Sequence, residues 1–142
     1  MLEEKEESLR SKMNINEICE EFFHKEWGNE KVRLHSSCMI EACLNMIKDT
    51  SLDPEIFIIA GWIHDIGRKT DVEKHPQISA ELLNKFLDEN KSFSDKKEIL
   101  LDCILNHKRS GKPQTVYGMI FQAADKASLY NNRWIASKFS FS

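Results

Sequence analysis

The stretch Ile56–Gly67, with the sequence IFIIAGWIHDIG, decides the fold of this chain. Its first eight residues form the longest apolar run in the sequence, and they follow Asp53-Pro54, a typical helix start. A helix that is apolar on nearly every side belongs in the centre of a domain. We therefore predict a buried central helix over residues 54–64, with Gly67 acting as its C-terminal stop.

Further helical segments lie on both sides of this central helix. Apolar residues spaced by three and four predict helices that begin near Asn14, Lys31 and His75. Another helix is expected after a cap at Ser94 or Asp95. The last one is expected to begin near Thr115, and its predicted apolar face is Val116, Met119, Ile120, Ala123 and Ala127. Since no alternating β-pattern or internal repeat occurs, we predict an all-α bundle of about five to seven helices.

The bulk properties of the chain indicate one globular domain. Its 142 residues suit a single domain over residues 13–142, and a charged segment at residues 1–12 is expected to be frayed. The net charge of −3 argues against a nucleic-acid polymer as partner. No apolar run approaches the roughly 20 residues that span a bilayer, and the acidic N-terminus is unlike a secretory signal. We therefore expect no membrane partner and a cytoplasmic location.

The four cysteines also fit a reduced intracellular protein. Each lies in an apolar periodic segment, and none forms a C-x-x-C pair. We therefore predict buried free thiols at these positions rather than a disulfide framework or a zinc knuckle. The positions are Cys19, Cys38, Cys43 and Cys103.

Six ionisable residues lie at the ends or on the core-facing sides of apolar helices. They are His35, His64, Asp65, His75, His107 and Asp125. A buried imidazole or carboxylate is unfavourable without a partner, and a shared metal site would satisfy all six. Each residue alone could instead be a helix cap or a polar group with hydrogen-bond partners. The dipeptide His-Asp alone is weak evidence for a metal site. The ordered set, with each member on its own helical segment, favours a metal site between residues 31 and 130.

The sequence around these residues resembles the HD superfamily of metal-dependent phosphohydrolases, which is named for a His-Asp pair. The matching pieces are Arg33-Leu34-His35, Ala60 to Arg68, Lys74-His75-Pro76, Ile104 to His107 and Ala123 to Ala127. The resemblance implies that His35, His64, Asp65 and Asp125 hold one divalent ion. It also implies a second ion at His75 and His107, with Asp65 bridging the two.

Two branches of the superfamily are closest in pattern. His64 to Arg68 with His75-Pro76 resembles cyclic-dinucleotide phosphodiesterases, although their Gly-Tyr-Pro signature is absent here. The same stretch together with His107 and residues 111–126 is more similar to bacterial HD-type hydrolases of dinucleoside tetraphosphates. The resemblance therefore implies a small phosphorylated substrate, and a nucleotide is the expected kind.

The expected chemistry is hydrolysis of a phosphate ester or anhydride by metal-activated water. Fe, Mn, Ni, Co, Zn and Mg are not distinguished by the ligand types. Asp65 is expected to bridge the ions and take part in catalysis, while Arg68 could offer a forked donor to phosphate. Lys108 and Arg109 are further candidates for substrate binding. A non-catalytic metal or nucleotide sensor and a di-iron oxygenase stay open as alternatives, and so does a homodimer.

Overall fold

Six α-helices and two 3-10 helices make up residues 14–128, the part of the chain that the computed structural model describes. They are α2 (Ile15–Glu26), α3 (Glu30–Ile47), α4 (Pro54–Ile63), η1 (Ile66–Lys69), α5 (His75–Glu89), η2 (Lys91–Lys96), α6 (Lys97–Leu105) and α7 (Val116–Ser128). This part contains no strand, which confirms the predicted all-α class. The segment predicted to be frayed, residues 1–12, lies outside the described residues.

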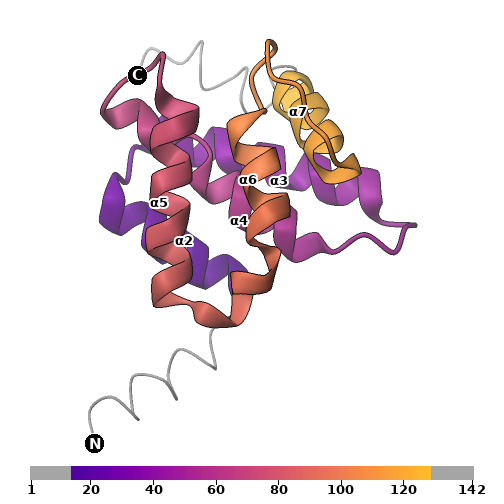
Figure 1. Ribbon diagram of the computed structural model, residues 1–142, viewed down its shortest axis with the longest axis horizontal. Coiled ribbons are helices and arrows are strands. Elements are labelled where there is room, and N and C mark those ends of the chain that lie inside the picture. Colours follow the sequence, from indigo (N-terminus) through magenta and orange to yellow (C-terminus); the bar gives the residue numbers. More distant parts are fainter. Residues whose placement is uncertain (1–13, 129–142) are drawn as a thin grey trace, which may run out of the picture.

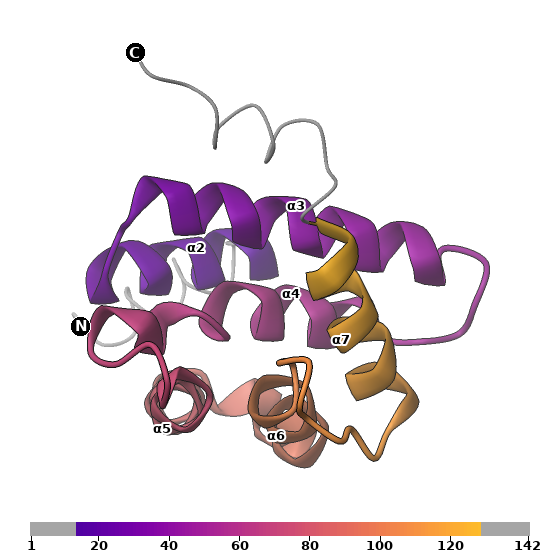
Figure 2. The same cartoon turned by 90° about the horizontal axis from the view of Figure 1, so that it is seen from above.

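Helix α4 is the centre of the domain, as its apolar sequence predicts. Asp53 caps it by accepting a hydrogen bond from the backbone N–H of Glu55, and Pro54 opens its first turn. The side chains of Phe57, Ile59 and Ile63 are fully buried. Helices α2 and α3 lie on one side of α4, and α5 and α6 lie on the other (Figures 1 and 2).

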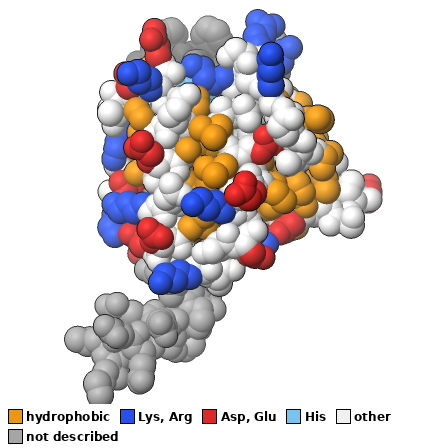
Figure 3. Space-filling model, viewed as in Figure 1, with side chains coloured by type: hydrophobic (Ala, Val, Ile, Leu, Met, Phe, Trp, Pro, Cys, Tyr) orange, Lys and Arg blue, Asp and Glu red, His pale blue; other side chains and the backbone are white. Residues whose placement is uncertain are grey.

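Helix α7 packs across one end of this arrangement, against α3 and α6 (Figure 2). Its predicted apolar face is wrong for four of five residues, because Val116 and Met119 are 51% and 55% exposed, and Ala123 and Ala127 are exposed as well. Ile120 is half-buried and packs against the core. The buried side is instead Gly118, Phe121, Ala124 and Ser128. Apolar side chains consequently gather on the surface over α7 (Figure 3). Both sides of this helix carry apolar residues, so spacing alone selected the wrong one.

Two predicted helix boundaries also need correction. Gly67 does not end α4, which stops at Ile63 and continues through His64 into the 3-10 helix η1. Gly67 is needed for a different reason, because a Cβ there would overlap the backbone oxygen of His75. Ser94 and Asp95 do not cap a helix, since both lie inside η2 and α6 begins without a side-chain cap.

The cysteines are buried free thiols, as predicted. Burial raises the pKa of Cys43 to about 12, so its thiol stays protonated at neutral pH. Over residues 14–128, none of the helices has the length and apolar character needed to cross a bilayer.

Candidate metal centre

The six candidate ligands meet at the C-terminal end of α4. They come from α3 (His35), the end of α4 (His64 and Asp65), the first residue of α5 (His75), the loop after α6 (His107) and α7 (Asp125). Five of them are buried, and Asp125 is half-buried. The short link through η1 keeps the start of α5 close to the end of α4. His64 and His75, which are 11 positions apart, therefore face the same centre.

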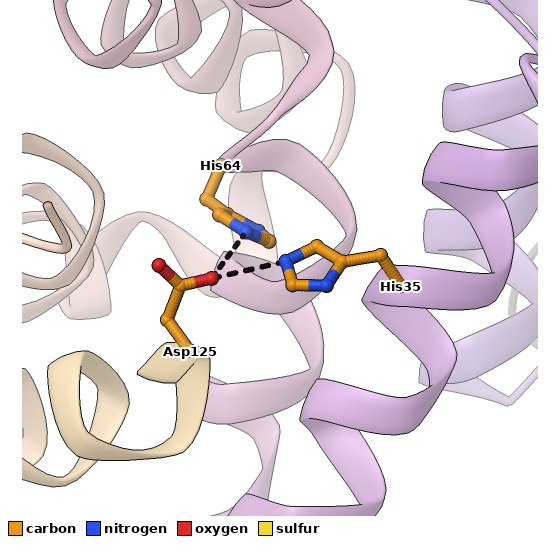
Figure 4. A group of neighbouring side chains, drawn as sticks. All are labelled: His35, His64 and Asp125. Carbon is orange, nitrogen blue, oxygen red and sulfur yellow. Dashed lines mark hydrogen bonds and ion pairs between the residues drawn. The ribbon is translucent and has the colours of Figure 1, made fainter. Parts of the chain in front are cut away.

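His35, His64 and Asp125 form the first of two clusters (Figure 4). Oδ1 of Asp125 lies 3.0 Å from Nε2 of His35 and 3.8 Å from Nε2 of His64. Two ligands that each sit about 2.1 Å from one ion are at most about 4.2 Å apart. The three side chains, which point toward one another from three different helices, therefore fit a single ion.

Asp65 joins this first cluster to a second one at His75 and His107. His64, Asp65 and His107 also form a group that could hold a metal ion, so the two clusters adjoin at His64 and Asp65. Its Oδ2 atom lies 3.2 Å from Nε2 of His64 and 3.5 Å from Nε2 of His35. Its Oδ1 atom lies 3.2 Å from Nε2 of His75 and 3.7 Å from Nε2 of His107. Each oxygen of one carboxylate thus faces a different pair of imidazoles, which is the arrangement expected of a bridging ligand.

Backbone carbonyls fix the orientation of three of the imidazole rings. In each case Nδ1 donates to the carbonyl three residues earlier: Gly61 for His64 (2.8 Å), Val72 for His75 (2.7 Å) and Ile104 for His107 (2.6 Å). A carbonyl only accepts, so Nδ1 carries a hydrogen, and the Nε2 atom, which has a free lone pair when the ring is neutral, is turned inward. Histidines that ligate metals are oriented by outer contacts of this kind.

Ser128 orients the fourth ring, and sequence reasoning missed it. Its hydroxyl donates to the backbone carbonyl of Asp125 at 2.8 Å, so it accepts from Nδ1 of His35 at 3.3 Å. Ser128 is fully buried at the end of α7. The only signal in the sequence was its spacing of three residues from Asp125, which places both on one side of the helix.

The inward-facing Nε2 atoms lack the partners that buried polar atoms need, and a bound cation would supply them. Nε2 of His64 is buried and has no hydrogen-bond partner among residues 14–128; its contacts with the two carboxylates have ion-pair distance only. Nε2 of His75 lies 2.9 Å from Nε2 of His107. Buried lone pairs that face one another are unfavourable, so the donor set fits divalent ions bound by imidazole and carboxylate.

The electrostatics of the ion-free centre are dominated by burial and by the two carboxylates. Burial lowers the pKa of His64, but Asp65 and Asp125 outweigh this and raise it to about 10. Burial and the charge of His64 lower the pKa of His107 to about 4. Although burial opposes it, the charge of His64 holds the pKa of Asp65 well below its usual range. Because an imidazole binds a metal ion in its deprotonated form, an ion and a proton would compete for Nε2 of His64.

Arg68 lies beside the carboxylate of Asp65 rather than free in a loop. Its Nε donates to Oδ1 of Asp65 at 3.0 Å, and its side chain is 39% exposed. Within the described chain, its two Nη atoms form no hydrogen bond or ion pair. The guanidinium can therefore hold Asp65 with one nitrogen and offer the others to an anion.

The other two predicted substrate-binding residues lie in the loop directly after His107. Nζ of Lys108 donates to the backbone carbonyl of Glu73 at 3.4 Å, and Arg109 is exposed. Lys108 therefore connects this loop to the turn before α5. Contact of either residue with a substrate stays a prediction.

Comparison with known proteins agrees with this geometry. The family model described as HD domain matches residues 32–129, which is more than half of the chain. The chain belongs to the HD domain family. HD domains are in general metal-dependent phosphohydrolases that bind divalent metal ions.

A curated relative supports membership of the HD domain family. Ribonuclease Y of Lawsonia intracellularis (strain PHE/MN1-00) is 31% identical over 99 residues, which is 68% of this chain. The matched region is 18% of that relative, so the chain spans a small part of its length. No solved structure matches significantly.

Proposed function

We propose that this HD domain hydrolyses a phosphate ester or anhydride of a nucleotide with the help of two divalent transition-metal ions. The observation that carries the proposal is the convergence of four inward-facing Nε2 atoms on the two oxygens of Asp65. A purely structural histidine cluster would have no need to leave Nε2 of His64 without a partner in a buried position.

The two clusters define which residues would hold each ion. His35, His64 and Asp125, with Oδ2 of Asp65, would hold the first. His75 and His107, with Oδ1 of Asp65, would hold the second. Divalent ions supply a lowered pKa of a coordinated water, towards ~7, and neutralise charge on phosphate.

The side chains of the protein do the remaining work. Asp65 fixes the separation of the two clusters, because its carboxylate is held by Arg68 as well as by the imidazoles. The Nη atoms of Arg68 orient a phosphate group, and Lys108 and Arg109 attract an anionic substrate toward the metal centre. The carbonyl contacts at Nδ1 hold each ring in place with its Nε2 atom turned inward.

Within this proposal a dinucleoside tetraphosphate is the first substrate to test, and a cyclic dinucleotide is the next. The relative named ribonuclease Y adds a second candidate, cleavage of a phosphodiester in a short RNA. The net charge of −3 favours a small nucleotide over a long polymer. A sensor that binds metal or nucleotide without turnover is the non-catalytic alternative.

The proposal is tested by metal analysis followed by a substrate panel. The protein is loaded with Mn²⁺, Co²⁺ or Fe²⁺ and incubated with nucleoside phosphates, diadenosine tetraphosphate, cyclic dinucleotides and a short single-stranded RNA. We expect about two ions per chain and release of phosphate or nucleotide. Asp65→Ala should abolish both, whereas His24→Ala, at a histidine with a 52% exposed side chain, should change neither. A fully loaded protein without turnover would favour the sensor.

A further inference from the structure

The side chain of Gln122, on α7, donates hydrogen bonds to several backbone carbonyls of the loop that follows α6. Its Nε2 atom donates to the carbonyls of Lys108 at 2.8 Å, Gly111 at 3.0 Å and Asn106 at 3.3 Å. A side-chain amide has two hydrogens, so three carbonyls share them. Gln122 thus contacts three residues between positions 106 and 111 of the loop, which runs from residue 106 to residue 115.

This loop is tightly closed around the amide. The N–H of Gly111 donates to the carbonyl of Lys108 at 2.8 Å. A Cβ at Gly111 would overlap the backbone of Asn106, so these two residues lie in close contact. The carbonyls that face inward would repel one another without a donor between them, and Gln122 is that donor.

The loop carries His107, which belongs to the second cluster of the metal centre. Gln122 precedes Asp125, a member of the first cluster, by three residues on α7, so the two side chains lie on the same side of that helix. Helix α7 therefore supplies one ligand directly and supports another through a side-chain amide. The two clusters are therefore connected in two ways. Asp65 contacts the histidines of both, and Gln122 joins the loop of His107 to the helix that carries Asp125.

We propose that Gln122 is a positioning residue that sets His107 and the loop from Lys108 to Gly111 relative to Asp125. The loop part of this proposal rests on contacts within the chain alone, whereas its effect on the second ion rests on the proposed two-ion function. Loss of the amide donor should make the loop more mobile and lower the affinity for the second ion. The affinity for the first ion should stay unchanged.

The loop is tested in metal-free protein with Gln122→Glu, which keeps the shape of the side chain and removes its donors. Gln114→Glu is the matched control, since Nε2 of Gln114 donates to a single carbonyl, that of Lys112, at the end of the same loop. Trypsin cleaves after Lys108 and Arg109. We expect Gln122→Glu to be cut there about tenfold faster than wild type, because local opening becomes easier. The control should be cut at the wild-type rate.

The metal link is tested by titrating the same proteins with Co²⁺ and following both binding steps by calorimetry and absorption. We expect the weaker step to lose about 10–100-fold in affinity in Gln122→Glu, as outer-shell changes commonly produce, and the tighter step to stay unchanged. A wild-type chain that binds one ion would overturn the two-ion function and this metal link together, while the tryptic rates would still decide the loop.

Three outcomes would overturn the proposal for the loop. The first is equal tryptic rates in Gln122→Glu and wild type. The second is equal acceleration in the Gln114→Glu control, which would show that added charge is responsible. If Gln122→Glu does not fold by circular dichroism, Gln122→Met takes its place. Failure of both to fold would show that Gln122 supports the whole domain rather than the loop.

Discussion

The Nε2 atoms of His75 and His107 lie 2.9 Å apart, and each ring donates from its Nδ1 atom to a backbone carbonyl. Both Nε2 atoms would present lone pairs to one another in a buried position unless a proton or a metal ion separates them. Oδ1 of Asp65 lies on the same side, at 3.2 Å from His75. This pair is therefore the best place to test for a second ion.

Replacing His107 by Ala should remove the second ion and retain the first. The first cluster keeps His35, His64 and Asp125, whereas the second is left with His75 and one oxygen of Asp65. Metal content measured by mass spectrometry should fall from about two ions to about one per chain. The control is His24→Ala, which changes an exposed histidine on α2. Retention of both ions by His107→Ala would contradict the proposed ligand set.

Replacing Arg68 by Ala should reduce kcat/KM about 10–100-fold, the range expected for loss of a hydrogen bond between charged groups. Arg68→Lys should rescue little, because an ammonium cannot hold Asp65 and a phosphate through one planar fork. Steady-state kinetics on the substrate found in the panel would measure both. Lys69→Ala, which changes the neighbouring lysine that pairs with Glu26, is the control. Wild-type kinetics in Arg68→Ala would exclude the residue from substrate binding.

Gly67→Ala should lower the free energy of unfolding by about 1–3 kcal/mol, the usual cost of overpacking. The added methyl group would collide with the carbonyl of His75 and with Oγ of Ser79. Because His75 begins α5, the collision should also move this ring and weaken the second ion. Urea denaturation and a metal titration would detect the two effects. Thr70→Ala, at an exposed position after η1, should change neither the free energy of unfolding nor the affinity for the second ion.

Asp102→Asn should lower the free energy of unfolding at pH 7 by about 2 kcal/mol, because charge-assisted hydrogen bonds are lost. Although burial opposes it, hydrogen bonds from Thr115, Gln114 and Asn106 lower the pKa of Asp102 in the folded protein. Its stabilising effect is therefore present above the unfolded pKa of about 3.9 and lost as the pH falls through the lower folded value.

The difference in unfolding free energy between Asp102→Asn and wild type should accordingly shrink between pH 5 and pH 2. Urea denaturation across this range would measure it. Asp88→Asn, at an exposed aspartate on α5, should show no such difference at pH 7. A gap that stays constant down to pH 2 would show that shape, rather than charge, explains the effect of the Asp102 substitution.

Sequence patterns alone predicted the centre of the fold and the positions of the candidate ligands. The run before His64 has one interpretation, because a helix that is apolar all round must be buried and must present its end to the core. That His35 and Asp125 share a site with this end was implied by the family resemblance, because spacing on α3 and α7 does not fix how these helices pack. The packing partners of each helix then decide the remaining details.

The face of α7 shows what periodicity cannot decide. Val116 and Met119 on one side and Phe121 and Ala124 on the other are all apolar, so burial depends on where α3 and α6 lie. The contacts of Ser128 with His35 join residues 93 positions apart, and only the assembled fold reveals them. The role of Gly67 likewise depends on how closely α5 approaches, which is a tertiary property.

The carbonyl contacts of His64, His75 and His107 order these three rings when the protein folds, before any ion binds. Each ring is tied to the residue three positions before it, so its rotamer is chosen as the local turn forms. The entropy of ordering these rings is therefore spent during folding, and none of it is subtracted from the affinity for an ion. The centre is preorganised, and ion binding should proceed at the rate of desolvation and proton release rather than at the rate of a conformational search.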